Sequence, residues 1–288
     1  MARVRELANG KLSAEFDSVS EVFRVIKKLN WVPKHDKASD RKKSVYGSDF
    51  HTFKDLAEAE DIFVNHPDSI RTFSINDDRL ERPESPGKDV SFDVTGDYLD
   101  IGKFMEGEPE HFGNAVMGNP KNIFCTINIL TSYVSYTQAS YLDARQKRIL
   151  RLVDWLETQG VRCQIIASID TVCLYSSVVI KEFQDPFDLN QLAVIAHGDW
   201  LRRILFLVAE QSKTWQGGYG NSQNYDRRML KYKPNPEDGM YIYIGGWNPY
   251  SSVKKLDEEF DKLEAKVADL VEQGITWNDE PFTFGQPA

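Results

Sequence analysis

The clearest pattern of apolar and polar positions lies between Asn122 and Phe183. It opens with an apolar run that is too continuous for a strand with one wet face, which is typical of a strand buried on both sides in a mostly parallel sheet. The apolar residues of this run are Ile123, Phe124, Cys125, Ile127, Ile129 and Leu130. We therefore expect residues 123–130 to form the central strand of the fold.

A helix and two more strands follow that run. Apolar residues recur at helical spacing from Leu142 to Leu156, and Gly160 ends the pattern. The two apolar runs after it, 161–169 and 174–183, are separated by four residues, which suits a hairpin and is too short for a crossover helix. The basic residues that fill the other face of the helix are Arg145, Lys147, Arg148 and Arg151.

The remaining C-terminal patterns extend the same alternation. Asp188 and Asp199 are expected to cap two helices, residues 240–246 form a last buried strand, and residues 253–272 form a long charged helix. The order is strand, helix, strand, strand, helix, helix, strand, helix. This order predicts an α/β domain over residues 121–288, with a mostly parallel sheet and helices on both of its faces.

Residues 1–120 predict a smaller α+β region. Ser18 and Glu21 have the spacing of a capping box ahead of a helix that ends near Trp31, and a second helix is expected from Thr52 to Phe63. Short strands are expected at 89–94 and 98–101, joined as a tight hairpin.

Composition supports a folded protein without a membrane span. The 288 residues are 41% hydrophobic and 12% aromatic, and no window approaches eighteen uninterrupted apolar residues. The first twelve residues lack the apolar block of a signal peptide, so a cytoplasmic location is expected. The three cysteines, Cys125, Cys163 and Cys173, lie in or beside predicted strands and lack metal-ligand spacing, so we expect buried thiols.

Charge is distributed unevenly along the chain. The net charge of -9 argues against a general nucleic-acid binder. Residues 1–43, however, carry eleven lysines and arginines against six acids. Nucleic acid or an acidic partner can dock on such a basic segment, whereas the simpler interpretation, which we favour, is a solvated helix face.

Candidate binding residues gather where the predicted strands end. In open α/β sheets, ligands bind beyond the carboxyl ends of the strands. Here these ends are the hydroxyl-rich loop 131–140, the turn at Asp170, and residues 247–249. His197, between two helices, is either a general base or, as we favour, a hydrogen-bonded histidine at a helix junction. The candidates for a binding site are Asn128, Ser132, Ser135, Thr137, Asp170 and His197.

The element order resembles a von Willebrand factor A-type domain over residues 121–274. In that family a divalent cation binds an Asp-x-Ser-x-Ser motif at the end of the first strand. The matching residues here are Asn128-Ile-Leu130-Thr-Ser132, in which an amide replaces the carboxylate and leucine replaces the first serine. Because Mg²⁺ requires an anionic oxygen ligand, we expect no metal cofactor at this position.

A second resemblance covers residues 48–210. Residues 92–110, the helix 148–160 and the segment 197–204 are similar to a family of uncharacterised proteins encoded by tailed phages and bacterial mobile elements. That resemblance implies a source, with the host bacterial cytoplasm as the location, and no activity.

Two functions remain open. The first is a non-enzymatic protein-interaction module that grips a partner, such as an ATPase or another phage or host protein, at the carboxyl ends of the strands. The second is a metal-dependent enzyme that processes nucleic acid or handles nucleotides, with Mg²⁺ bound by an acidic cluster. The acids of that cluster are Asp97, Asp100, Glu108 and Glu110. We favour the first function because no catalytic set can be assembled from spacing.

Overall fold

The computed structural model describes most of the predicted α/β region and part of the segment before it. The described residues are 2–32, 55–70, 90–93, 98–99, 112–115, 124–131, 139–185, 189–196, 200–215, 240–244, 252–273 and 282–284.

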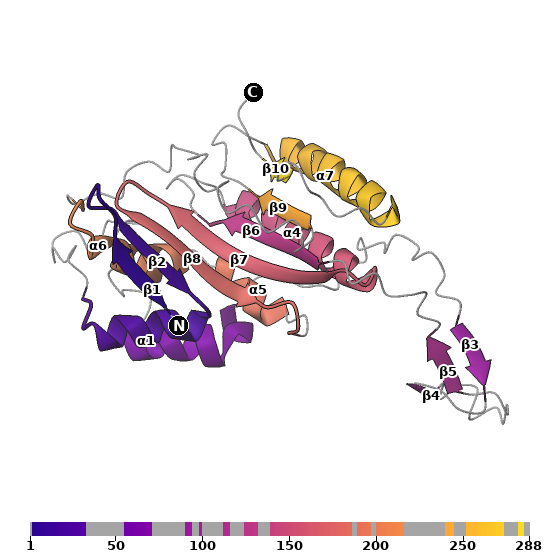
Figure 1. The fold of residues 1–288 in the computed structure, drawn as a ribbon, viewed down its shortest axis with the longest axis horizontal. Coiled ribbons are helices and arrows are strands. Elements are labelled where there is room, and N and C mark those ends of the chain that lie inside the picture. Colours follow the sequence, from indigo (N-terminus) through magenta and orange to yellow (C-terminus); the bar gives the residue numbers. More distant parts are fainter. Residues whose placement is uncertain are drawn as a thin grey trace.

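A seven-stranded mixed sheet forms the centre of the molecule, in the order β1-β2-β8-β7-β6-β9-β10 (Figure 1). β6 pairs in parallel with both β7 and β9, so the predicted central strand has a neighbour on each side. β7 and β8 form the predicted antiparallel hairpin. The strands are β1 (Arg3–Glu6), β2 (Leu12–Phe16), β6 (Phe124–Leu130), β7 (Arg162–Asp170), β8 (Leu174–Lys181), β9 (Met240–Ile244) and β10 (Phe282–Phe284).

Together with the mixed sheet, the described helices make the structure α/β, as expected. The α-helices are α1 (Val19–Lys28), α2 (Leu56–Glu60), α4 (Ala139–Thr158), α5 (Leu189–Ala196), α6 (Phe206–Glu210) and α7 (Val253–Gln273). Two helical stretches include a π-helical turn, Asp61–Asn65 after α2 and Trp200–Leu205 before α6.

The cap of α1 and the end of α4 agree with the sequence, whereas the start of α2 does not. Ser18 caps α1 by accepting from the backbone N–H of Glu21 at 3.2 Å, and the Glu21 carboxylate accepts from the backbone N–H of Asp17 at 2.8 Å. Gly160 follows α4 with φ of 80°, the left-handed conformation that favours glycine after a helix. α2 is capped by Asp55, three residues later than the start we expected.

The described α-helices cover one face of the large sheet. Cys125, Ile127 and Ile129 of β6 belong to one buried apolar cluster, to which each described α-helix contributes. The alternate positions Leu130, Tyr241 and Tyr243 form a second buried cluster, and Tyr175 of β8 packs against it, so the described members of this cluster all lie on strands. In Figure 1 the strands pass in front of α4 and α5. The expected helices on both faces are therefore not found among the described elements. We expected them because β6 looked continuously apolar, whereas its apolar residues in fact alternate with polar ones.

The N-terminal strands extend the sheet. β2 pairs in parallel with β8, and β1 adds an antiparallel outer strand. Residues 3–16 thus belong to the same sheet as the C-terminal strands, which the sequence did not predict. The proposed boundary at residue 120 lies outside the described residues and stays a prediction.

A separate three-stranded sheet has the order β3-β5-β4, with β3 (Val90–Asp93), β4 (Tyr98–Leu99) and β5 (Phe112–Ala115). We expected β3 and β4 to pair as a hairpin, and this is wrong. β5 lies between them and pairs antiparallel with both. The later strand β5 therefore occupies the position beside β3 that the sequence spacing had assigned to β4.

Candidate functional site

The carboxyl edge, as we call it here, is the end of the large sheet where β6, β7 and β9 finish at Leu130, Asp170 and Ile244. Two predicted site residues, Asn128 and Asp170, lie in the described part of this edge. Strand residues two apart face the same side, so Asp170 lies on the same side as Ser168. Ser168 in turn bonds Asn128 across β7 and β6. The structure therefore brings both predicted residues to one face at one end of the sheet.

Asn128 is the centre of a buried polar network across three strands. Its Oδ1 accepts from Ser168 Oγ at 2.6 Å, and its Nδ2 donates to the Tyr241 hydroxyl at 3.0 Å. All three residues are buried. Since both polar atoms of the Asn128 amide bond within the sheet, a cation at this position would have to displace Ser168 from the amide oxygen.

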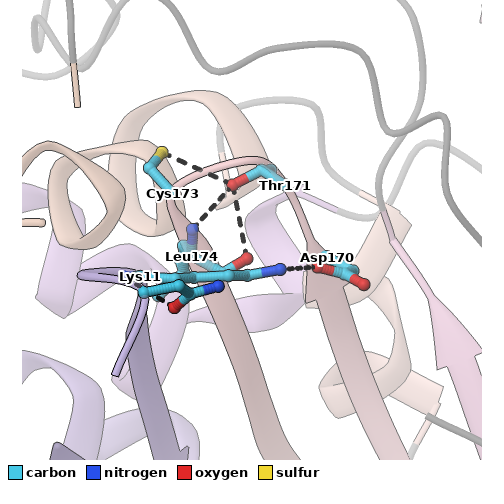
Figure 2. Close-up of polar contacts among 6 residues, drawn as sticks. Lys11, Asp170, Thr171, Cys173 and Leu174 are labelled. Atoms are coloured by element: carbon cyan, nitrogen blue, oxygen red, sulfur yellow. Dashed lines mark hydrogen bonds and ion pairs between the residues drawn. The ribbon is translucent and has the colours of Figure 1, made fainter. Parts of the chain in front are cut away.

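Asp170 forms a largely buried ion pair with Lys11 (Figure 2). The two side chains are 12% and 17% exposed. Lys11 directly precedes β2, so the pair joins the N-terminal strands to the end of β7. A predicted binding residue and a residue of the basic segment thus neutralise each other.

The β7–β8 turn is fixed by its own side chains (Figure 2). Thr171 Oγ1 accepts from the backbone N–H of Leu174 at 3.0 Å and lies 3.5 Å from Cys173 Sγ. Burial raises the pKa of Cys173, against opposing effects of Thr171 and Lys11. A raised pKa keeps the thiol protonated near neutral pH, which disfavours a nucleophilic role.

Arg145 of α4 is a residue of the carboxyl edge that the sequence pattern placed on the basic face of its helix and not among the candidate site residues. Its Nη2 donates to the carbonyl oxygens of Leu130 at 3.0 Å and Ile244 at 3.3 Å, the last residues of β6 and β9. Burial lowers its pKa, while the phenols of Tyr141 and Tyr243 act in the opposite direction. The sequence contained a signal for this placement. Helical side chains tilt toward the helix N-terminus, and Arg145 lies in the first two turns of α4, the helix that follows β6.

Five of the six described basic residues of the N-terminal segment lie in ion pairs with acids. Arg3 and Arg5 lie 3.4 and 3.8 Å from the carboxylate of Glu15. The other ion pairs are Lys11 with Asp170, Arg24 with Glu21 and Lys27 with Glu60. These partners offset the positive charge that a phosphate backbone would require.

The other predicted site residues lie outside the described part of the chain. They are Ser132, Ser135, Thr137 and His197, with the acidic cluster Asp97, Asp100, Glu108 and Glu110. Among the described residues, no group of three or more His, Cys, Asp or Glu is placed to hold a metal ion. All three cysteines are free and buried, as expected.

Comparisons with known proteins give a family and no activity. The model of a family described as "Domain of unknown function (DUF7192)" matches residues 4–271. No curated protein and no solved structure matches the chain. Within the described ranges, no helix is both long enough and apolar enough to cross a membrane.

Proposed function

The chain belongs to the DUF7192 family, and we propose that it is a non-enzymatic protein-interaction module that grips a protein partner at the carboxyl edge. The observation that carries this proposal is the position of its exposed apolar side chains. In the described part of the chain, the large apolar residues with substantial exposure are Leu29, Val32, Val172 and Val253.

Two of these valines follow strands of this edge along the chain. Val172 is 63% exposed and lies in the turn after β7, between Thr171 and Cys173. Val253 is 39% exposed and is the first residue of α7, the next described helix after β9. Both therefore follow strands that end at the carboxyl edge.

The other two, Leu29 and Val32, are linked to this edge by hydrogen bonds of Gln211 and Ser212. The carbonyl oxygen of Val32 accepts from Gln211 Nε2 at 3.1 Å, and Ser212 Oγ donates to the carbonyl oxygen of Gly10 at 3.0 Å. Gly10 precedes Lys11, which pairs with Asp170. Leu29 and Val32 thus lie at the end of α1 that is tied to the carboxyl edge.

A contiguous patch of exposed apolar side chains is typical of a protein contact surface, and we propose that these residues contribute to one at the carboxyl edge. The turn that carries Val172 is also fixed by the Lys11–Asp170 pair and by Thr171. A docking residue on a fixed turn loses little entropy on binding.

We add proposals about the sheet arrangement, the source, the location and the kind of partner. The strand order β8-β7-β6-β9-β10, with β8 antiparallel, supports an A-type arrangement, to which β1 and β2 add strands beyond β8. We also propose a phage or mobile-element source, a cytoplasmic location, and an ATPase or another phage or host protein as partner. These rest on the sequence resemblances above.

The experiment is a capture from the native cell with the tagged full chain. We expect a specific protein to be recovered by the wild type and lost with Val172→Asp and with the double variant Ser132→Ala, Ser135→Ala. The matched control is Thr158→Asp, which introduces the same charge at an exposed position at the far end of α4.

Capture is repeated with a chelator to separate the two functions. An interaction module retains its partner when Mg²⁺ is removed. If only nucleic acid is recovered, and in equal amount with the wild type and Val172→Asp, the proposal is refuted and the metal-dependent enzyme is favoured. Asp100→Ala and Glu108→Ala then become the test of that enzyme.

A further inference from the structure

The carboxyl edge contains a topological switch point between β6 and β9. β6 continues through α4 to β7 on one side, whereas β9 is followed by α7 and β10 on the other. The connections thus diverge between these two parallel strands. In open α/β sheets, small ligands bind beyond the carboxyl ends of the strands, at the point where the strand order reverses.

Arg145 occupies this divergence. Its Nη2 bonds the last carbonyl of each diverging strand, Leu130 at 3.0 Å and Ile244 at 3.3 Å. The residue is only partly accessible, which places a positive charge within the protein but not sealed from solvent. A charge in such low-dielectric surroundings acts on an ion of opposite sign more strongly than a surface charge does.

Two residues close to Arg145 in sequence, Gln146 and Arg148, hold α4 against other helices. Gln146 Nε2 donates to the carbonyl oxygen of Leu192 in α5 at 2.9 Å. Arg148 contacts α7, at 3.1 Å from Glu264 and with its guanidinium 5.5 Å from the ring centroid of Phe260. Contacts with two other helices therefore hold α4 in place, so the guanidinium is preorganised.

The surroundings of Arg145 include two phenols. Tyr141, one turn earlier on α4, and Tyr243 of β9 both interact electrostatically with the guanidinium. Burial raises the pKa of Tyr141, and the carboxylate of Glu259 in α7 acts in the same direction. A guanidinium matches the planar geometry of carboxylate or phosphate oxygens, and a phenol hydroxyl adds one further donor.

We infer that Arg145 and Tyr141 bind a small oxyanion, the phosphate or carboxylate group of a ligand, at the switch point between β6 and β9. This site goes beyond the proposed docking function and does not depend on it. The docking function concerns exposed valines, whereas the oxyanion site lies between the strand ends and the first turns of α4.

The test uses the full chain and two simple probes. Sodium phosphate and sodium acetate are titrated separately by calorimetry at constant ionic strength, with chloride as the balancing anion. We expect saturable binding of at least one probe, and a preference for one of them identifies the source of the oxyanion. Arg145→Gln should weaken that binding about 10-fold or more, because it removes a charge-assisted bond. The control Lys147→Gln removes the same charge from an exposed position on α4 and should change affinity by less than about 2-fold.

No saturable binding of either probe to the wild type would overturn the inference. So would equal affinities of the wild type and Arg145→Gln. If Arg145→Gln does not fold, Glu259→Gln replaces it, since it keeps Arg145 and removes a negative charge near Tyr141. We then expect binding to tighten, and an unchanged or weaker affinity would contradict the assignment.

Discussion

The ammonium of Lys181 lies 2.9 Å from the carboxylate of Glu157, although the Lys181 side chain is only 2% exposed. Lys181 also donates to the carbonyl oxygens of Cys163 at 2.8 Å and Glu182 at 3.1 Å. Glu157 accepts from the backbone N–H of Cys163 at 2.9 Å. The pair therefore joins β8, the start of β7 and the end of α4.

Removing the charge of Glu157 should be more harmful than removing that of Lys181. Glu157→Gln leaves a buried ammonium without its counter-ion, which costs about 3 kcal/mol or more. Lys181→Met leaves a carboxylate that still accepts from Cys163 and is 16% exposed, so the loss should be smaller. Urea unfolding of both variants measures the free energies, and a larger loss for Lys181→Met would contradict this account.

The network around Asn128 should behave as one unit. Ser168→Ala leaves the Asn128 amide oxygen without its donor, and Tyr241→Phe leaves the amide N–H without its acceptor. Each should destabilise the fold by about 1–3 kcal/mol, the cost of an unsatisfied buried group. In a double-mutant cycle we expect the two losses not to add, because both act through one amide. Strict additivity would show that the two bonds are independent.

The thiols should be unreactive in the native protein. Cys163 hydrogen-bonds Cys125 on the paired strand, and this bond together with burial raises the pKa of Cys163 well above its ordinary value. Burial also raises the pKa of Cys173. At pH 8 a thiol reagent should therefore react with all three only as fast as the protein unfolds. Rapid reaction of one thiol without denaturant would contradict their placement.

Stability should depend on Glu264 in a predictable direction. Burial raises the pKa of this carboxyl above 4.5, and Arg148 opposes that effect. Because the folded state holds the proton more tightly than the unfolded state, the contribution of Glu264 is present below pH 4.5 and is lost as the pH rises through the raised pKa.

Glu264→Gln does not titrate, so its stability relative to the wild type should increase between pH 4 and pH 7. Urea unfolding at several pH values measures this difference, in which the other groups cancel. Asp261→Asn is the control, because Asp261 also contacts Arg148 but is far more exposed. A difference that falls with pH would mean that Arg148 outweighs burial.

The sequence predicted the parts of the fold that local patterns determine. The run before Leu130 identified an interior strand, Gly160 identified the end of α4, and the four residues between β7 and β8 identified their hairpin. In each case the signal lies in neighbouring residues, where periodicity or steric freedom restricts the structure directly.

Long-range pairing could not be predicted in the same way. β1 has a mostly exposed, charged sequence, and β2 is only five residues long, so neither has a strong strand pattern. β2 becomes a strand by pairing with β8, more than 150 residues later. Likewise β5 separates β3 from β4, which no spacing between those two strands reveals.

For the site, sequence analysis identified Asp170 as a residue of the carboxyl edge but not Lys11 as its partner. Lys11 was counted with a basic segment, since its proximity to Asp170 depends on the β2–β8 pairing. Arg145 was grouped with the basic face of its helix and was not a candidate site residue. Its contacts with two strand ends depend on the order of β6 and β9 in the sheet.

The central claim, a protein partner at the carboxyl edge, is tested most directly by site-specific photocrosslinking in the native cell. A benzophenone amino acid is placed at Val172, in the exposed turn after β7, or at Thr158, exposed at the far end of α4. We predict a discrete crosslinked protein from position 172 that is absent from position 158. Identical products from both positions, or none from position 172, would contradict the claim.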